Sequence, residues 1–294
     1  MRVVVVALGV LCVLTKVALP VTALTKGPQA NTVQAGQPDR AAAVMASARE
    51  ALGGEAKLSA LKTLIAQGRT RQVRGENLVP IEFDIQIEFP DRYSRRDEFP
   101  AQDAGPTTTG FSGNTLIQVP PGPSQPEAAV RTRVTATQQD FARLMLGMLG
   151  SSFSALPLTF KYVGQAEAPQ GKADVLDATG PGNFAARLFI NSETHLPMLV
   201  SWHAPPPPAR RGGPQPPGPP PAGPPAAGAP AGSRPAGAPS AVVEQRLFFA
   251  EYRDVDGLKF PFRLRRASGA ETTEETTFDR YRVNARIDPR RFSN

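Results

Sequence analysis

The stretch Ile81-Glu82-Phe83-Asp84-Ile85-Gln86-Ile87-Glu88-Phe89 alternates strictly between large apolar residues and acidic or amide residues. A period of two residues is typical of a β-strand, because successive side chains point to opposite faces of a sheet. Burial of each large apolar side chain contributes about 1.5–3 kcal/mol. A slip of one residue would carry Glu82, Asp84 and Glu88 into the core. The stretch therefore predicts a half-buried antiparallel strand in a fixed register.

Similar alternation recurs along the chain, separated by turn residues at spacings of roughly ten residues. We predict strands within 66–74, 94–99, 107–119, 158–163, 173–178, 184–191, 198–202 and 258–265. Residues 107–119 should form a hairpin around Gly113-Asn114, whereas 130–136 is too short to assign. Glu271, Glu274 and Glu275 lie among threonines, which favours a solvated edge strand over a catalytic carboxylate pair. Together these strands predict one large antiparallel sheet.

Three segments have helical patterns. Asp39 would cap a helix over 41–52 that ends at Gly53-Gly54, and a shorter helix over 55–64 would carry Leu58, Leu61 and Ile65 on one face. The strongest pattern predicts a helix over 138–150 with an apolar stripe. The stripe comprises Phe141, Leu144, Met145, Met148 and Leu149. It either packs into a core or covers a cavity, for which methionines would provide an adaptable lining.

The N-terminal residues 1–23 resemble an export signal. Arg2 precedes an apolar run over 3–14, and small residues follow Pro20. The run is shorter than the roughly 20 residues that span a bilayer; an uncleaved anchor is the alternative. The only cysteine, Cys12, lies in this segment, so the mature chain would have no disulfide or thiol nucleophile. A flexible lead-in would follow over 24–38.

Residues 204–240 consist mostly of Pro, Gly and Ala. Such a composition cannot bury enough apolar surface to fold, so we predict a disordered, extended insert. Strands on both sides point to one sheet, which makes 39–294 a single domain with an overgrown hairpin loop. A domain linker or a proline-rich recognition motif are the alternatives.

Catalytic chemistry is not indicated. The chain has only two histidines, His195 and His203, and neither lies in a G-x-S-x-G or H-E-x-x-H context. We predict no enzyme activity, no cofactor and no metal. The formal net charge of +7 comes from scattered arginines; an exported protein would not meet nucleic acid, so they indicate solubility or contact with an anionic membrane surface.

Three local motifs carry a family resemblance. They are Ala51-Leu52-Gly53-Gly54 followed by Leu58, Leu61, Leu64 and Gly68; residues 188–197 (LFINSETHLP); and residues 252–262 (YRDVDGLKFPF). The last two resemble a "D-x-x-T-x-L-P" turn, with Asn191 in place of the acid, and a "Y-x-x-V-x-G-x-x-x-P" strand-turn-strand. Such motifs are similar to those of the outer-membrane lipoprotein carrier (LolA/LolB-like) superfamily, especially its uncharacterised envelope members. The Pro-rich insert is foreign to that pattern.

The resemblance implies an α+β fold in which a large antiparallel sheet forms an open, unclosed β-barrel with covering helices. It also implies an envelope protein, here periplasmic and monomeric, that holds a lipid, acyl chain or other hydrophobic group against the concave face. The candidate ligand-binding residues are the large apolar ones of the strands and the covering helix: Phe83, Ile85, Ile87, Phe89, Phe141, Leu144, Met145, Met148, Phe260 and Phe262. The alternative is a non-catalytic structural or regulatory envelope protein with a filled core, whose Pro-rich loop contacts another envelope protein.

Overall fold

The computed structural model describes residues 37–75, 77–100, 105–151, 153, 156–168, 171–204 and 242–294. The predicted signal peptide lies outside the described residues. So do the lead-in, apart from its last two residues, and the insert, apart from Ala204.

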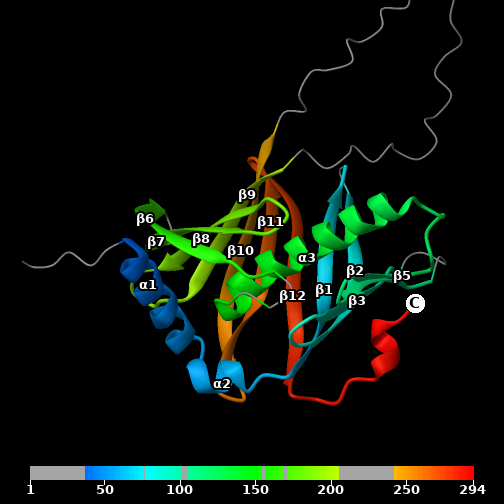
Figure 1. Cartoon of the computed structure of the whole chain (residues 1–294), viewed down its shortest axis with the longest axis horizontal. Helices are drawn as coiled ribbons and strands as arrows, with labels where there is room; N and C mark the ends of the chain where they lie inside the picture. Colours follow the sequence, from blue (N-terminus) through cyan, green and yellow to red (C-terminus); the bar gives the residue numbers. More distant parts are fainter. Residues whose placement is uncertain are drawn as a thin grey trace, which may run out of the picture. The chain divides into compact units, whose positions relative to one another are not determined.

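Within the described residues, twelve strands form one antiparallel sheet in the order β5-β4-β3-β2-β1-β12-β11-β10-β9-β8-β7-β6 (Figure 1). The strands are β1 (Thr63–Arg74), β2 (Asn77–Glu88), β3 (Arg92–Glu98), β4 (Thr107–Ser112), β5 (Thr115–Val119), β6 (Thr159–Ala168), β7 (Gly171–Gly180), β8 (Phe184–Asn191), β9 (Pro197–Ala204), β10 (Val243–Val255), β11 (Leu258–Ser268) and β12 (Glu271–Val283). Strands β5 and β6 are the two unpaired ends of this sheet. The predicted unclosed barrel is thereby confirmed.

The predicted strand over 81–89 is confirmed as β2, which runs from Asn77 to Glu88 and buries the predicted apolar face, whereas Phe89 lies just beyond its end. Phe83, Ile85 and Ile87 are each at most 5 % exposed. Phe83 pairs with Gly68 on β1 and meets Phe278 edge to face at 5.3 Å. A Cβ atom at Gly68 would lie 2.2 Å from the Thr277 carbonyl oxygen. Only glycine therefore lets the strands approach closely enough for the Phe83 ring to lie over β1.

The edge-strand prediction for 271–275 is wrong. β12 lies in the interior of the sheet, between β1 and β11. Its inward side chains Phe278 and Tyr281 are buried, and the Thr276 hydroxyl lies 2.8 Å from that of Thr70 on β1. Threonine has a high strand propensity and pairs well across strands, so its presence did not mark an edge.

Helix α3 (Glu127–Leu149) joins the two free ends of the sheet, because it follows β5 and precedes β6. The connection must therefore cross the sheet, and Figure 1 shows α3 running over its concave face. The helix starts eleven residues before the predicted position, and 130–136 belongs to it. Several β-branched residues there lower helix propensity, but the Thr132 and Thr137 hydroxyls donate to the carbonyls of Ala128 and Arg133 at 2.9 Å.

The N-terminal helices also differ from their predictions. α1 (Gln37–Ala51) begins before Asp39, which therefore does not cap it, and α2 (Glu55–Ser59) ends within one turn. The Asn284 side chain holds the backbone that follows α2, because its Nδ2 donates to the Ala60 carbonyl at 3.2 Å and its Oδ1 accepts from the Lys62 amide at 2.7 Å. Ile65 lies on β1, which can pair with strands on both sides.

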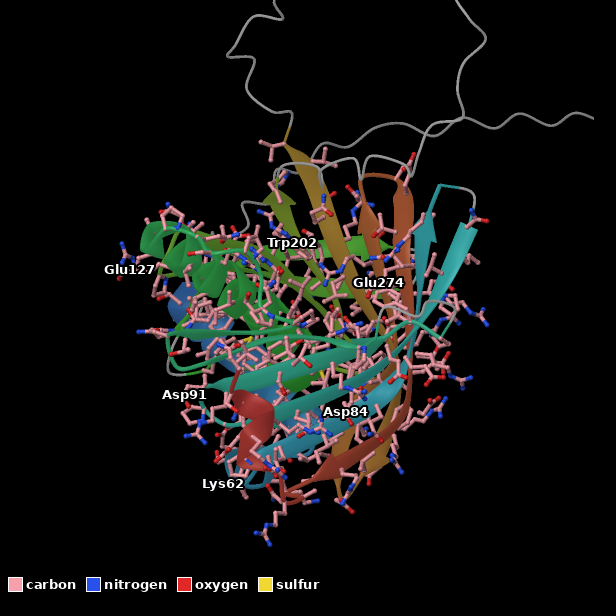
Figure 2. The ribbon with its side chains drawn as sticks, turned by 90° about the vertical axis from the view of Figure 1, so that its right-hand side faces the viewer. Lys62, Asp84, Asp91, Glu127, Trp202 and Glu274 are labelled. Carbon is pink, nitrogen blue, oxygen red and sulfur yellow. The ribbon has the colours of Figure 1, made fainter. Side chains whose placement is uncertain are left out.

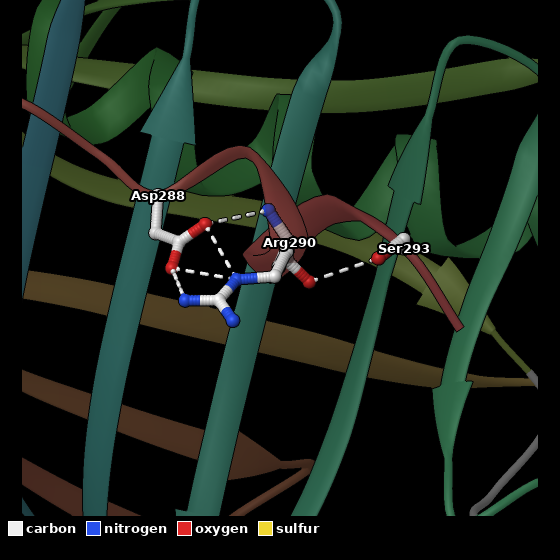
Figure 3. A network of polar contacts seen from close by, with 3 residues as sticks. All are labelled: Asp288, Arg290 and Ser293. Atoms are coloured by element: carbon white, nitrogen blue, oxygen red, sulfur yellow. Dashed lines mark hydrogen bonds and ion pairs between the residues drawn. The ribbon is translucent and has the colours of Figure 1, made fainter.

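The C-terminal segment (residues 284–294) covers part of the convex face. Its short 3₁₀-helix η1 (Pro289–Phe292) lies against β3 and β4 and buries Phe292. Figure 3 shows the polar contacts of Asp288, Arg290 and Ser293 in this segment. The Asp288 carboxylate accepts from the Arg290 amide at 3.0 Å and pairs with its guanidinium at 2.6 Å. Hydrogen bonds from Arg290 lower the pKa of Asp288 to about 2. Asn294 bonds to the backbone of β5 through Gln118 and Leu116, which protects this edge strand.

Gly147 lies where α3 presses on β10. A Cβ atom there would be 1.9 Å from Cζ of the buried Phe249 ring. Gly→Ala in an open helix stabilises by about 1 kcal/mol, whereas overpacking here would cost about 1–3 kcal/mol. We expect Gly147→Ala to lower the free energy of unfolding in urea, and to do so less in a Phe249→Leu background. A stabilised single variant would show that the helix does not press on the strand.

Candidate functional site

A cavity of about 320 Å³ lies between α3 and the concave face of the sheet. Apolar side chains from β2, β10, β11, β12 and α3 line one part of it: Phe83, Ile85, Phe141, Leu144, Leu247, Leu264 and Phe278. Threonines and charged groups line the rest. The volume is near the lower limit of small-molecule sites in proteins, about 300–1,000 Å³.

The ten predicted lining residues divide into two groups. Phe83, Ile85, Phe141 and Leu144 line the cavity. The other six lie elsewhere. Ile87, Met145, Met148, Phe260 and Phe262 are buried in the closed core, and Phe89 is half-buried beyond the end of β2, in a separate small pocket with Leu58 and Leu61.

A set of polar residues on the inner face was not predicted. Arg95, Arg266, Glu274 and Thr276 line the cavity, and we call these four the polar wall. Arg95 donates to Asp97 at 2.7 Å and to the Thr70 hydroxyl at 3.4 Å. Thr70 lies 2.8 Å from Thr276, whose hydroxyl donates to Glu274 at 3.3 Å. These hydrogen bonds can all point one way: Arg95 donates to Thr70, Thr70 donates to Thr276, and Thr276 donates to the Glu274 carboxylate.

Neighbouring charges keep the Arg95 guanidinium protonated. Burial lowers its pKa, but the carboxylates of Asp97 and Glu274 raise the pKa by more than burial lowers it. The net result is a pKa above the ordinary value. The guanidinium also lies over the Phe83 ring, 4.8 Å from its centroid.

Arg266 occupies the other side of the polar wall. In the register of β11 and β12, Arg266 lies opposite Glu274. The Arg266 guanidinium lies 5.7 Å from the Trp202 ring centroid. Figure 2 labels Glu274 on β12 and Trp202 on β9. In the sheet order, these two strands lie on opposite sides of β11. Arg143 of α3 lies 4.7 Å from the same indole ring and forms an ion pair with Asp140 at 2.8 Å. Phe262, Leu264 and Arg266 lie two residues apart on β11, so their side chains share one face of the sheet. Alternation alone could therefore have predicted that Arg266 points inward.

Tyr93 lines the cavity between two aromatic neighbours. Its ring lies 4.9 Å from that of Phe141, and burial raises the pKa of its hydroxyl to about 12. The unfolded value is about 10. Because the folded pKa is higher, this contribution to stability is complete below about pH 10 and is lost as the pH rises towards 12.

We therefore expect the free energy of unfolding to fall less steeply from about pH 9 to about pH 11 in Tyr93→Phe than in the parent protein. Urea unfolding at each pH measures the two slopes. Burial also raises the pKa values of Tyr252 and Tyr281, so part of the alkaline loss should remain. Identical slopes would show that the Tyr93 hydroxyl is hydrated.

Three larger hollows lie elsewhere in the described part of the chain, and the smallest of them, about 360 Å³, is lined by polar residues of β1, β2 and β3. A groove of about 610 Å³ on the convex face is floored by Phe189, Leu199 and Phe248, which are cross-strand neighbours. A polar hollow of about 590 Å³ lies near His203. Both His195 and His203 are exposed. Within the part of the chain that the structure describes, no three His, Cys, Asp or Glu side chains converge on a possible metal position.

No protein-family model matches the chain, and no curated protein matches it in sequence. Among solved structures, a LolA superfamily protein of Nitrosomonas europaea superposes with a TM-score of 0.52 at 11 % identity, covering 86 % of this chain and 97 % of that chain. The fold is LolA-like.

Two further solved structures superpose less well. A domain from Vibrio parahaemolyticus described as outer membrane lipoprotein-sorting has a TM-score of 0.47 at 8 % identity, covering 87 % of this chain and 97 % of its own. A DUF1329 family protein of Desulfovibrio piger has a TM-score of 0.48 at 9 % identity, covering 88 % and 98 %. No helix in the described ranges combines the length and apolar character needed to cross a membrane.

The sequence motifs stabilise the LolA-like fold at its turns. Asn191 Oδ1 accepts from the amides of Glu193 and Thr194 at 2.9 and 2.8 Å, as an aspartate would in that turn. The Leu52 carbonyl accepts from the Lys259 amide at 2.8 Å, which joins the first motif to the third. None of these contacts reaches the cavity, so the motifs carry the fold and leave the ligand undefined.

Proposed function

We propose that this protein is an exported envelope binding protein that holds one acyl or alkyl chain in the cavity beneath α3. The proposal depends mainly on one observation. A cavity of about 320 Å³ lies under a helix that crosses a LolA-like sheet, and Phe83, Ile85, Phe141 and Leu144 line it. Burial of an apolar chain there contributes about 25 cal/mol for each Å² removed from water.

Export and an envelope location follow from the predicted signal peptide over 1–23 and belong to the same proposal. We also propose that the protein carries its ligand without transforming it. Two of the charged residues that line the cavity, Arg95 and Asp140, are each engaged in an ion pair. In the alternative of a structural or regulatory protein, the Pro-rich insert would contact a protein partner in the envelope.

Native mass spectrometry of the full-length gene product, purified from its own envelope, tests the proposal. We expect a mass adduct equivalent to one ligand per chain, and lipid extraction to release a molecule with a single long chain. A clean unliganded mass, together with no thermal stabilisation by fatty acids, long-chain alcohols or lipopeptides, would contradict ligand binding. It would favour the filled-core structural or regulatory protein.

A further inference from the structure

Two residues of the polar wall carry opposite charges but do not form an ion pair with each other. Arg266 and Glu274 are direct cross-strand partners, and both line the cavity. Among the described residues, however, neither forms an ion pair. Glu274 accepts from the Thr276 hydroxyl, and Arg266 lies over the Trp202 ring. Each therefore retains hydrogen-bonding capacity directed at the cavity.

The remaining charges around the cavity are already compensated. Arg95 pairs with Asp97 at 2.7 Å, and Arg143 pairs with Asp140 at 2.8 Å. Arg266 and Glu274 complete a balanced set of three cations and three anions. Any net charge on a ligand would disturb this balance, and an uncompensated charge is costly at a site that is partly removed from solvent.

This arrangement discriminates between ligand head groups. A carboxylate near Arg266 would also approach the like charge of Glu274, and an ammonium near Glu274 would approach Arg266. An uncharged group that both accepts and donates can satisfy the two residues together. Its oxygen would accept from the Arg266 guanidinium, and its N–H or O–H would donate to the Glu274 carboxylate.

We infer that the cavity selects a chain that ends in an uncharged amide or hydroxyl group bound between Arg266 and Glu274. The chain itself lies against Phe83, Ile85, Phe141 and Leu144. This inference rests on the proposed function and specifies the chemical class of its ligand.

Four probes of one chain length test the inference: tetradecanamide, tetradecanol, tetradecanoate and tetradecylammonium. Each competes with a fluorescent acyl probe on the full chain, below its own micelle concentration. We expect the amide and the alcohol to bind about tenfold more tightly than either charged probe. Glu274→Gln should shift the preference towards tetradecanoate, and Arg266→Gln should shift it towards tetradecylammonium.

Matched controls come from the next position on each strand. Arg265 and Glu275 are also cross-strand partners but lie on the convex face, so Arg265→Gln and Glu275→Gln should leave the order of the four probes unchanged. Equal binding of all four probes would overturn the inference and leave the proposed function intact. Tightest binding of tetradecanoate to the parent protein would overturn it in favour of an anion site. Failure of every probe to bind would contradict both proposals.

Discussion

Leu144→Trp is expected to weaken binding of a long-chain ligand at least tenfold, a free-energy change of about 1.4 kcal/mol or more. Leu144 lies on α3, lines the cavity and is only partly buried. The larger indole can therefore enter the cavity and occupy the volume that the chain would fill, without displacing the closed core. Displacement of a fluorescent acyl probe measures the affinity, and thermal unfolding should show a melting temperature no lower than that of the parent.

Ala136→Trp is the matched control, because Ala136 lies on the exposed side of the same helix. It should bind like the parent protein. Leu199→Trp would fill the convex groove instead. If that variant lost binding while Leu144→Trp kept it, the ligand would lie on the convex face and the proposed site would be wrong. Met145→Asp is a poor test, since Met145 is 1 % exposed and its replacement would unfold the core.

Phe292→Ala is expected to lower the free energy of unfolding by about 3–5 kcal/mol. Phe292 is 7 % exposed and is the buried side chain of η1. On the same convex face, Ile65 and Ile117 are 7 % and 1 % exposed, although they lie outside the main core. Removal of the ring would leave a cavity above β3 and β4. A loss of this size is a large fraction of typical domain stability, about 5–15 kcal/mol.

Urea unfolding measures the effect, and Arg291→Ala is its control because Arg291 is exposed on the same short helix. The control should change stability by no more than about 0.5 kcal/mol. Equal, small effects of the two variants would show that the C-terminal segment does not stabilise the sheet. Ligand affinity should remain unchanged in both folded variants, because the segment lies on the face opposite the cavity.

The sequence predicted the sheet well, because alternation reports which face each side chain points to. Phe83, Ile85 and Ile87 are buried as expected. The cavity could not be predicted in the same way. Met145 and Leu144 belong to one apolar stripe, yet one is buried in the core and the other borders a cavity. That difference depends on the distance between α3 and the sheet, which periodicity does not encode.

The polar wall was missed for another reason. Arg95, Arg266 and Glu274 all lie on the inner face, in frame with Tyr93, Leu264 and Thr276. Charged residues on strands are usually solvated, so their position in the alternation was overlooked. The strict rule that charges face water fails here because each inward charge finds a carboxylate, a guanidinium, a hydroxyl or an aromatic ring.

The pairing of β1 with β12 has a consequence for how the chain folds. Thr70 and Thr276, which meet across these strands, lie 206 positions apart in the sequence. The first and last strands along the chain thus pair with each other in the middle of the sheet. Contacts between residues so far apart in the sequence make folding slow. Until β12 pairs with β1, one edge of β1 remains unpaired. The apolar side chains beneath α3 then lack the part of the sheet against which they pack. We expect a long-lived, aggregation-prone intermediate on refolding, and a chain that stays unfolded until its C-terminal residues are available.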